Sequence, residues 1–255
     1  MQRAGINSLE VGLRLARALG ELGGAQALKD VAAAGGMAPA KAHRYFVSLI
    51  RAGLAEQERE SGRYRLGPLA LELGMAALRS IDVLHLGGEV ITDLRNEIDE
   101  TVLLAIWGNK GPVVARWEES SRPVATNVRA GWVMPLANSA TGRCFAAFLP
   151  ASVTEPLLKP EFARHPQERK RYPSRLEEIR AHGLSRVEGD LLRGVASVAA
   201  PVFGHDGAIA AVIASLGPQT AFNVAWEGPI ARATKAAAKR LSQRLGFPSQ
   251  AAAQR

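Results

Sequence analysis

Between residues 25 and 52 the apolar positions recur at the spacing of two short helices. Leu28, Val31 and Ala32 form the first apolar stripe, and Gly35-Gly36 can take the left-handed conformation that ends many helices. Pro39 suits the first turn of a second helix, because its missing N–H costs nothing there. The apolar face of that second helix carries Ala42, Tyr45, Phe46, Leu49 and Ile50. The basic and polar side chains fall mostly on the opposite face, so the pattern predicts two helices joined by a tight turn.

A pair of short strands is predicted directly after the second helix, which Gly53 closes. The runs 54–57 and 63–66 are joined through Glu60-Ser61-Gly62, where glycine can supply a positive φ. Two helices followed by a two-stranded wing have the geometry of a DNA reader, whose second helix fits the major groove. The alternative is an ordinary helical hairpin with a solvated polar face, because helix-turn-helix patterns are weak signals.

The helices on either side of this region are also visible in the pattern. Asn7 is predicted to cap the preceding helix, with Glu10 as the reciprocal partner of a capping box. The following helix, over residues 68–79, is unusually apolar for a lone exposed helix, with Leu69, Leu71, Leu73, Met75 and Leu78. We expect its apolar face to be buried against a second protomer. The alternative is packing onto the C-terminal domain of its own chain.

The second half of the chain alternates strand and helix patterns. A bend is expected at Gly87-Gly88, followed by a helix to residue 98. Strands are predicted at 101–107, 112–118, 124–128, 195–203 and 208–216. Helices are predicted at 139–148, 152–158, 174–182 and 223–245, with a charged, proline-bearing connector between the second and third of these. Helices mixed around one antiparallel sheet imply an α+β domain.

Composition narrows the class of protein. The net charge of +8 and the isoelectric point near 10.1 favour a polyanionic partner. No run of eighteen apolar residues is present, so no membrane span is expected, and the N-terminus lacks the apolar core of an export signal. The lone cysteine, Cys144, excludes an intramolecular disulfide and fits a reducing cytoplasm.

Motifs for catalysis or metal binding are not found. The sequence has no phosphate-binding loop of the GxxxxGK[ST] type and no Gly-x-Ser-x-Gly elbow, and its five histidines are scattered. Cys144 is expected to act as a small buried apolar residue. We therefore expect no cofactor, no metal and no enzymatic activity.

The chain resembles the IclR-type transcriptional regulators along nearly its whole length. The segments that carry the resemblance in the first half are GINSLEVGLRLARALGELGG, MAPAKAHRYFVSLIRAGLAE and GRYRLGPLALELG. Those in the second half are MPLANSATGRCFAAFL, HGLSRVEGDLLRGVASVAAPVFGHDG and AIAAVIASLGP. The resemblance implies a winged helix-turn-helix domain over 1–67, a linker helix over 68–80, a GAF-like effector-binding domain over 81–247 and a disordered tail over 248–255. It also implies a homodimer or a dimer of dimers on a palindromic operator.

The DNA-contacting residues implied by this resemblance and by the helix pattern are Pro39, Ala40, Lys41, His43, Arg44, Ser48, Arg59 and Arg63. The family usually has Ser-Thr early in the recognition helix, where this chain has Ala40-Lys41. Ala40 could contact a thymine methyl group, and Lys41 a guanine edge or a phosphate. Arg44 is the first choice for a base or phosphate contact, and the wing arginines would follow the backbone or reach a minor groove.

A ligand site is expected where residues 134–142 lead from a strand end into a helix start. Small residues let a ligand approach the backbone, and the free N–H groups of a first helical turn suit an anion. The alternative, which can coexist with binding, is plain N-capping by Asn138 or Ser139. By resemblance, the effector-binding set is Trp107, Met134, Leu136, Ser139, Ala140, Thr141, Val187, Glu188, Ser197 and Ser215.

This predicted pocket is less polar than the family pattern. The position that often carries an acid reads Val187, with Glu188 beside it, and the usual serine pair reads Ala214 and Leu216. The usual histidine and lysine read Ala137 and Arg143. Aromatic residues expected near the pocket are Trp107, Trp117, Trp132 and Phe145. We therefore expect the effector to be a small organic acid that is aromatic or bulky and apolar.

The sequence thus predicts a cytoplasmic, ligand-responsive, DNA-binding transcriptional regulator, either a repressor or an activator. Two other classes stay open at this stage. An enzyme that uses the C-terminal cleft would turn over a small metabolite and ignore DNA. A protein-interaction adaptor would bind with little salt dependence, whereas phosphate contacts make DNA affinity fall steeply with salt.

Overall fold

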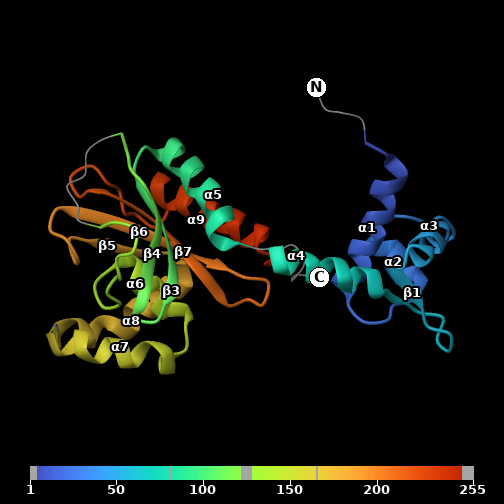
Figure 1. The fold of residues 1–255 in the computed structure, drawn as a ribbon, viewed down its shortest axis with the longest axis horizontal. Coiled ribbons are helices and arrows are strands. Elements are labelled where there is room, and N and C mark those ends of the chain that lie inside the picture. Colours follow the sequence, from blue (N-terminus) through green and yellow to red (C-terminus); the bar gives the residue numbers. More distant parts are fainter. Residues whose placement is uncertain (1–4, 81, 122–127, 165, 249–255) are drawn as a thin grey trace. The chain divides into compact units, whose positions relative to one another are not determined.

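The structure is a computed structural model that describes residues 5–80, 82–121, 128–164 and 166–248 (Figure 1). The chain divides into two compact units, Met1–Ile81 and Asp82–Arg255. Each unit has its own hydrophobic core.

The first unit consists of three helices, a small wing and a further helix (Figure 1). Its elements are α1 (Asn7–Leu22), α2 (Leu28–Ala34), α3 (Pro39–Arg51), β1 (Ala55–Gln57), β2 (Tyr64–Leu66) and α4 (Pro68–Ser80). The core joins Leu15 and Leu19 of α1, Val31 of α2 and Phe46 of α3 with Tyr64 of the wing. This is the helix-turn-helix with its wing that the apolar spacing predicts.

The wing is a two-stranded antiparallel sheet in which Glu56 pairs with Arg65. The two side chains also form an ion pair, with 2.6 Å between Glu56 Oε1 and Arg65 Nε. Gly62 in the connecting turn has a φ of +67°, which explains why glycine is needed there. A β-bridge from Gln26 to Tyr64 ties the segment before α2 to the same sheet.

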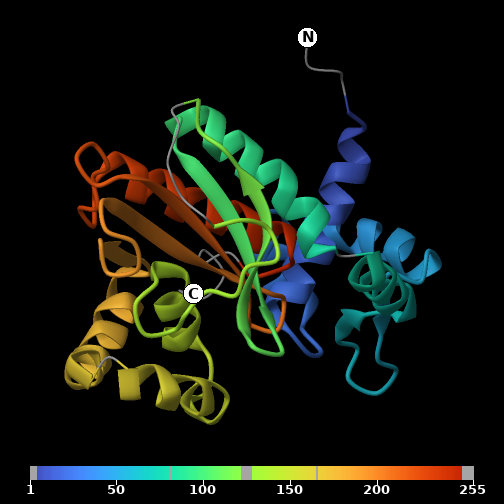
Figure 2. The same ribbon diagram turned by 60° about the vertical axis from the view of Figure 1, so that its left-hand side comes forward.

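The second unit is an α+β domain built on a five-stranded antiparallel sheet (Figure 2). The strands are β3 (Thr101–Gly108), β4 (Gly111–Glu118), β5 (Ser185–Glu188), β6 (Val195–Phe203) and β7 (Ile209–Pro218), in the spatial order β4-β3-β7-β6-β5. Helices α5 (Val83–Ile98) and α9 (Pro229–Arg244) pack side by side on one face. Helix α6 (Ala140–Phe148) packs against β6 and β7 from the other face, with α7 (Ala151–Arg164) and α8 (Pro166–His182) outside it (Figure 1).

The structure corrects two local predictions, the cap at Asn7 and the bend at Gly87-Gly88. Asn7 does not cap α1: it is the first helical residue, and the N-cap position is Ile6, without a side-chain cap. Gly87-Gly88 is not a bend but lies inside α5, where a methyl group on Gly87 would collide with Leu104 of β3. These two glycines are therefore needed for close packing of the helix on the sheet.

The connector predicted between residues 158 and 174 is largely helical. Helix α7 continues to Arg164 and includes Pro156 and Pro160, while α8 begins at Pro166 and includes Pro173. The short strand β5 was not predicted at all, and the predicted strand 124–128 falls mostly outside the described residues. The predicted tail at 248–255 lies outside them except for its first residue.

Candidate functional site

The exposed face of α3 carries one group of predicted site residues. Ala42, Phe46 and Leu49 are buried in the first unit's core, and this orientation leaves the remaining positions of the helix facing solvent. Six predicted DNA-contact residues of this helix are exposed, namely Pro39, Ala40, Lys41, His43, Arg44 and Ser48. Val47, Ile50 and Arg51 are exposed as well, although Ile50 was predicted on the apolar face. Lys41 and Arg44 give the predicted surface two cations beside hydrogen-bonding groups, which is the chemistry needed to contact phosphates and base edges.

The wing is fixed against α3 by aromatic and polar contacts. The rings of Phe46 and Tyr64 are 4.5 Å apart between centroids, and His43 Nδ1 lies 3.3 Å from the Tyr64 hydroxyl. Arg59 and Arg63 are exposed on the wing, although Arg63 Nη1 also donates to the carbonyl of Ala25 at 3.4 Å. His43 and Arg63 therefore also stabilise the first unit, whereas no hydrogen bond or ion pair within the described residues engages the side chains of Lys41, Arg44 and Arg59.

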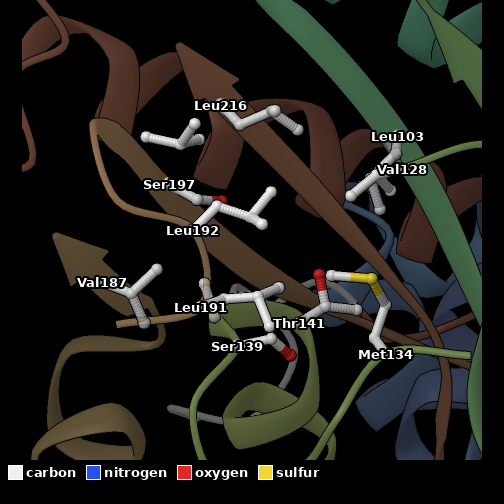
Figure 3. Close-up of a pocket in the computed structure, with 12 residues that line it drawn as sticks. Leu103, Val128, Met134, Ser139, Thr141, Val187, Leu191, Leu192, Ser197 and Leu216 are labelled. Atoms are coloured by element: carbon white, nitrogen blue, oxygen red, sulfur yellow. The ribbon is translucent and has the colours of Figure 1, made fainter. Parts of the chain in front are cut away.

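A second group of predicted residues surrounds a cavity between α6 and the sheet (Figure 3). The cavity is mainly apolar, and its free volume is about 40 Å³. Its lining residues are Leu103, Val128, Met134, Ser139, Ala140, Thr141, Val187, Leu191, Leu192, Val195, Ser197 and Leu216. They come from four strands, from the first turn of α6 and from the loops before α6 and between β5 and β6.

The polar part of the cavity lies at the N-terminus of α6. The Ser139 side chain caps this helix by accepting a hydrogen bond from Gly142 N–H at 2.8 Å, and its hydroxyl donates to the Pro135 carbonyl at 2.6 Å. The predicted N-capping role of Ser139 is therefore observed. Among the described residues, the N–H groups of Ala140 and Thr141 have no hydrogen-bond acceptor.

Thr141 contributes a hydroxyl group to the polar end of the cavity. Its side chain is 1% exposed and lines the cavity, yet its hydroxyl has no hydrogen-bond partner within the described part of the chain. Figure 3 shows this hydroxyl directed among the lining residues, next to Met134. A buried hydroxyl without a partner is costly, and a ligand oxygen can supply the missing bond.

A network of four charges lies outside the cavity, behind the same turn of α6. The Arg143 side chain, 1% exposed, pairs with Glu168 of α8 at 3.0 Å and with Asp190 of the β5–β6 loop at 2.7 Å. Arg175 of α8 contacts the same two carboxylates at 3.6 and 3.0 Å. Burial raises the pKa of the Asp190 carboxyl, but the two arginines outweigh burial and hold that pKa below its ordinary value.

Arg143 also connects this network to the segment before α6. Its Nε donates to the Ala137 carbonyl at 2.8 Å. From α7, the carboxylate of Glu161 accepts the N–H groups of Leu136 and Ala137 at 3.1 and 2.7 Å, while the Tyr172 hydroxyl donates to the Leu136 carbonyl at 2.8 Å. The backbone on which the cavity depends is thus held by side chains from three helices.

No group of histidine, cysteine, aspartate or glutamate side chains that could hold a metal ion occurs within the described ranges. Cys144 is fully buried in the core of the second unit, and burial raises the pKa of its thiol. It is therefore neither a metal ligand nor a reactive nucleophile in this structure.

The comparisons with known proteins cover both units. The family model described as the IclR helix-turn-helix domain matches residues 8–59, and the model described as bacterial transcriptional regulator IclR C-terminal matches residues 75–243. The chain belongs to the IclR family. Its first unit is the family's DNA-binding helix-turn-helix domain and its second unit is the family's effector domain, so the protein is a transcriptional regulator and not an enzyme.

Individual IclR-family members agree with this assignment. The glycerol operon regulatory protein of Streptomyces griseus is 32% identical over 189 residues, which is 70% of this chain and 71% of that protein. The transcriptional regulator KipR of Bacillus subtilis is 26% identical over 225 residues, or 86% of this chain and 90% of that protein. The crystal structure of Pseudomonas aeruginosa HmgR is 39% identical, with a TM-score of 0.89 over 96% of this chain and 100% of that one.

Within the described ranges, no helix is long and apolar enough to cross a membrane.

The structure brings together six of the ten effector-binding residues that the sequence predicts. Met134, Ser139, Ala140, Thr141, Val187 and Ser197 line the cavity. The other four, Trp107, Leu136, Glu188 and Ser215, do not line the cavity. Trp107 packs against Phe145 with 5.6 Å between ring centroids, and Leu136 belongs to the neighbouring core cluster under α7 and α8. Glu188 is exposed, since it alternates with Val187 along β5.

Ser215 lies on the opposite face of the sheet from the cavity. Its hydroxyl is 2.8 Å from that of Thr234 on α9, and its side chain is fully buried. The neighbouring position Leu216 faces the cavity, because successive side chains of a strand point to opposite faces. Of the other aromatic residues expected near the pocket, Trp117 packs against the core cluster that includes the lining residues, whereas Trp132 is 38% exposed.

Five further residues that line the cavity were not predicted from the sequence, namely Leu103, Val128, Leu191, Leu192 and Val195. The apolar pair Leu191-Leu192 inside an otherwise polar loop was the available signal, because an exposed loop has no reason to carry two adjacent leucines.

Proposed function

We propose that this IclR-family regulator senses a small aromatic or bulky apolar carboxylic acid in the cavity between α6 and the sheet. The protein acts in the cytoplasm, where the ligand changes the affinity of the winged helix for its operator. The observation that carries the proposal concerns Thr141, a residue that is only 1% exposed. It presents to the cavity a hydroxyl without a partner among the described residues, at the open first turn of α6.

The acid group of the ligand would be bound by the N-terminus of α6. The free N–H groups of Ala140 and Thr141 and the Thr141 hydroxyl together supply three hydrogen-bond donors. The helix dipole places partial positive charge at the same point, which favours an anion. Among the described residues no lysine or arginine lines the cavity, so in this part of the chain the helix dipole and the hydrogen bonds would neutralise the charge of the ligand.

The rest of the ligand would be apolar. The lining on the sheet side consists of Leu103, Val128, Val187, Val195 and Leu216, with Ser197 as its polar member. The Ser197 hydroxyl already donates to the Ser215 carbonyl at 2.9 Å, so it offers a ligand a lone pair more readily than a proton. A small acid with several hydroxyl groups would find this one acceptor and leave the other hydroxyl groups without partners on the sheet side, which disfavours it relative to an apolar acid.

The assembly that fits this role is a homodimer, or a dimer of such dimers, on a palindromic operator. On α4, Leu71, Leu73 and Met75 are 66, 56 and 49% exposed. Leu71 and Met75, four residues apart, share one face of this helix, and exposed apolar side chains of this kind suit burial against a second protomer. Two joined reading heads must contact half-sites about one helical turn, roughly 34 Å, or a multiple apart, so a small change in their spacing alters affinity.

The DNA contacts in this proposal are made by the exposed face of α3 and by the wing. Arg44 and Lys41 lie on the face of α3 that would enter the major groove, with Pro39, Ala40, His43 and Ser48 around them. Arg59 and Arg63 of the wing would follow the phosphate backbone. If the winged helix instead bound a protein as an adaptor, that binding would depend little on salt. A gel shift over a salt series therefore distinguishes DNA binding from an adaptor role.

That experiment is a gel shift on the DNA flanking the protein's own coding region, over a salt series from ~50 to ~200 mM. The expected result is sequence-specific binding that weakens by orders of magnitude over this range, because phosphate contacts release counterions. Arg44→Ala should weaken binding by about tenfold or more. Arg171→Ala, which removes the same charge from an exposed position of α8, is the control and should have no such effect.

The effector proposal is tested by thermal shift and by calorimetry with a panel of aromatic and aliphatic acids. A bound acid should raise the melting temperature of the protein. Thr141→Val removes the hydroxyl while keeping the shape of the side chain, and should weaken acid binding by about tenfold. Thr154→Val is the matched control, since Thr154 is also buried but lies on α7 outside the cavity. If the two variants bind the acid with equal affinity, the acid group does not bind at the N-terminus of α6.

A further inference from the structure

We infer that Leu191 and Leu192 determine the size of the effector, because they occupy the space that the apolar part of the ligand must take. This inference rests on the proposed function of the cavity and assigns a role to the loop between β5 and β6. The two leucines act as a lid over the cavity that is displaced when the ligand binds.

The first observation is where the two side chains lie. Both leucines are half-buried and line the cavity, and Figure 3 shows them in the middle of the ring of lining residues, between Val187 and Thr141. Seven of the other ten lining residues belong to strands or to α6, whose backbones are fixed by ladders and helical hydrogen bonds. Val128, Met134 and Ser139 precede α6, and Ser139 and Met134 are held there by hydrogen bonds. The leucines are on a loop between two strands, so they are a part of the wall that can move.

The second observation is the small free volume. An apolar cavity of about 150 Å³ binds benzene, so the 40 Å³ of this cavity is too small for an aromatic or bulky apolar acid. Such a ligand can enter only if lining side chains withdraw. The two leucines are candidates for this movement because they lie on a loop.

The third observation is how the loop is attached. It is closed on itself by Gly189 N–H to the Val195 carbonyl at 2.9 Å and by Val195 N–H to the Leu192 carbonyl at 3.1 Å. Gly189 and Gly194, on either side of the leucines, have φ angles of +77° and +79°. Glycine adopts these and other conformations readily, so the two positions can serve as hinges for the segment between them.

The fourth observation is that Asp190 holds the closed position from outside. Its carboxylate is bound by Arg143 and Arg175, and its carbonyl accepts a hydrogen bond from Asn138 Nδ2 at 3.2 Å. Asp190 is therefore a positioning residue: its ion pairs place the next two residues of the chain in the cavity. Because Arg143 and Asn138 flank the first turn of α6, the lid is attached to the same turn that would bind the acid group.

The experiment measures the dissociation constants of benzoate and of the larger naphthoate by calorimetry. It compares the unsubstituted protein with the variants Leu191→Ala and Leu192→Ala. In at least one variant, we expect the ratio of the benzoate to the naphthoate dissociation constant to rise by about tenfold or more. The space left by the leucine side chain would allow roughly two further methylene equivalents of the larger ligand to be buried. Leu176→Ala is the matched control: Leu176 is a half-buried leucine of the same unit, on α8 and outside the cavity.

The readout of preference separates this role from a structural one, since loss of packing alone lowers stability without changing the ratio of two affinities. If the unsubstituted protein binds an acid but both variants keep its ratio within about twofold, the lid inference is wrong and the proposed function stands. If neither acid binds the protein or any variant, the acid-sensing function fails, and the lid inference fails with it.

Discussion

Arg143 of α6 and Asp190 of the β5–β6 loop form an ion pair, with 2.7 Å between Nη1 and Oδ2, although the arginine side chain is only 1% exposed. A buried guanidinium is tolerated only when its charge and its donors are matched. Asp190 and Glu168 match the charge, while Glu168 and the Ala137 carbonyl accept hydrogen bonds from Nη2 and Nε. Nη1 faces Asp190 in an ion pair that lacks hydrogen-bond geometry. The three partners belong to different segments around α6. The pair therefore fixes the relative positions of the helix, the loop and the cavity between them.

Asp190→Ala should destabilise the second unit by about 3 kcal/mol, because breaking a buried pair leaves a charge without compensation. Urea unfolding followed by circular dichroism measures the loss. Glu177→Ala, which removes an equal charge from an exposed position on α8, should change the unfolding free energy by less than ~0.5 kcal/mol. Equal effects of the two substitutions would show that Asp190 is not structurally important.

The contribution of Asp190 should also depend on pH. The pKa of its carboxyl is raised by burial but lowered further by the two arginines, so in the folded protein it lies below the ordinary value of 3.8. The stabilisation is therefore complete above pH 3.8 and is lost as the pH falls through the lower folded pKa. The difference in unfolding free energy between the unsubstituted protein and Asp190→Asn should be constant near neutral pH and shrink in acid. A difference that grows in acid would contradict this.

Gly142→Ala should destabilise the second unit by about 2–3 kcal/mol through overpacking. A methyl group on Gly142 would overlap the Pro135 carbonyl oxygen and lie 2.6 Å from Leu136 Cα. The measurement is again chemical denaturation. Gly74→Ala is the control, because Gly74 is a helical glycine with no atom within 4 Å of the added methyl, and there alanine should be neutral or stabilising by up to ~1 kcal/mol.

Cys144 should not react with thiol-alkylating reagents while the protein is folded. The residue is fully buried, and burial raises the pKa of its thiol, so neither access nor thiolate is available. Mass spectrometry after incubation with iodoacetamide should show modification only on the timescale of unfolding, and rapid modification in denaturant. Fast alkylation under native conditions would mean that the core around α6 opens easily.

Local patterns in the sequence were sufficient for the DNA-binding unit. The positions 42, 46 and 49 predicted as apolar in α3 are buried, and Gly53 and Gly62 have the positive φ angles that their turns need. Each of these features depends on residues within a few positions of each other, because helical periodicity and turn conformation are local properties. Strand β6 was also predicted with its observed bounds, from a continuous, mainly apolar run that lies between glycine-containing turns.

Features that depend on distant contacts were harder to predict. Gly87-Gly88 signals a bend when only neighbours are considered, yet the pair lies inside α5 because Leu104 and Arg116 need the space. Three prolines between residues 158 and 174 suggested a broken connector, yet α7 and α8 form there. Packing of residues such as Leu158 and Tyr172 outweighs the lost backbone hydrogen bonds.

The sequence by itself determined the family, the helix-turn-helix and the α+β class, because each depends on local pattern or on motifs in a fixed order. Only the tertiary structure decided which side chains meet in the cavity. Strand register places Leu216 toward it and Ser215 away from it, and the loop that is ion-paired to Arg143 through Asp190 brings Leu191 and Leu192 into its lining. Both outcomes depend on contacts between residues far apart in the chain, which no local pattern records.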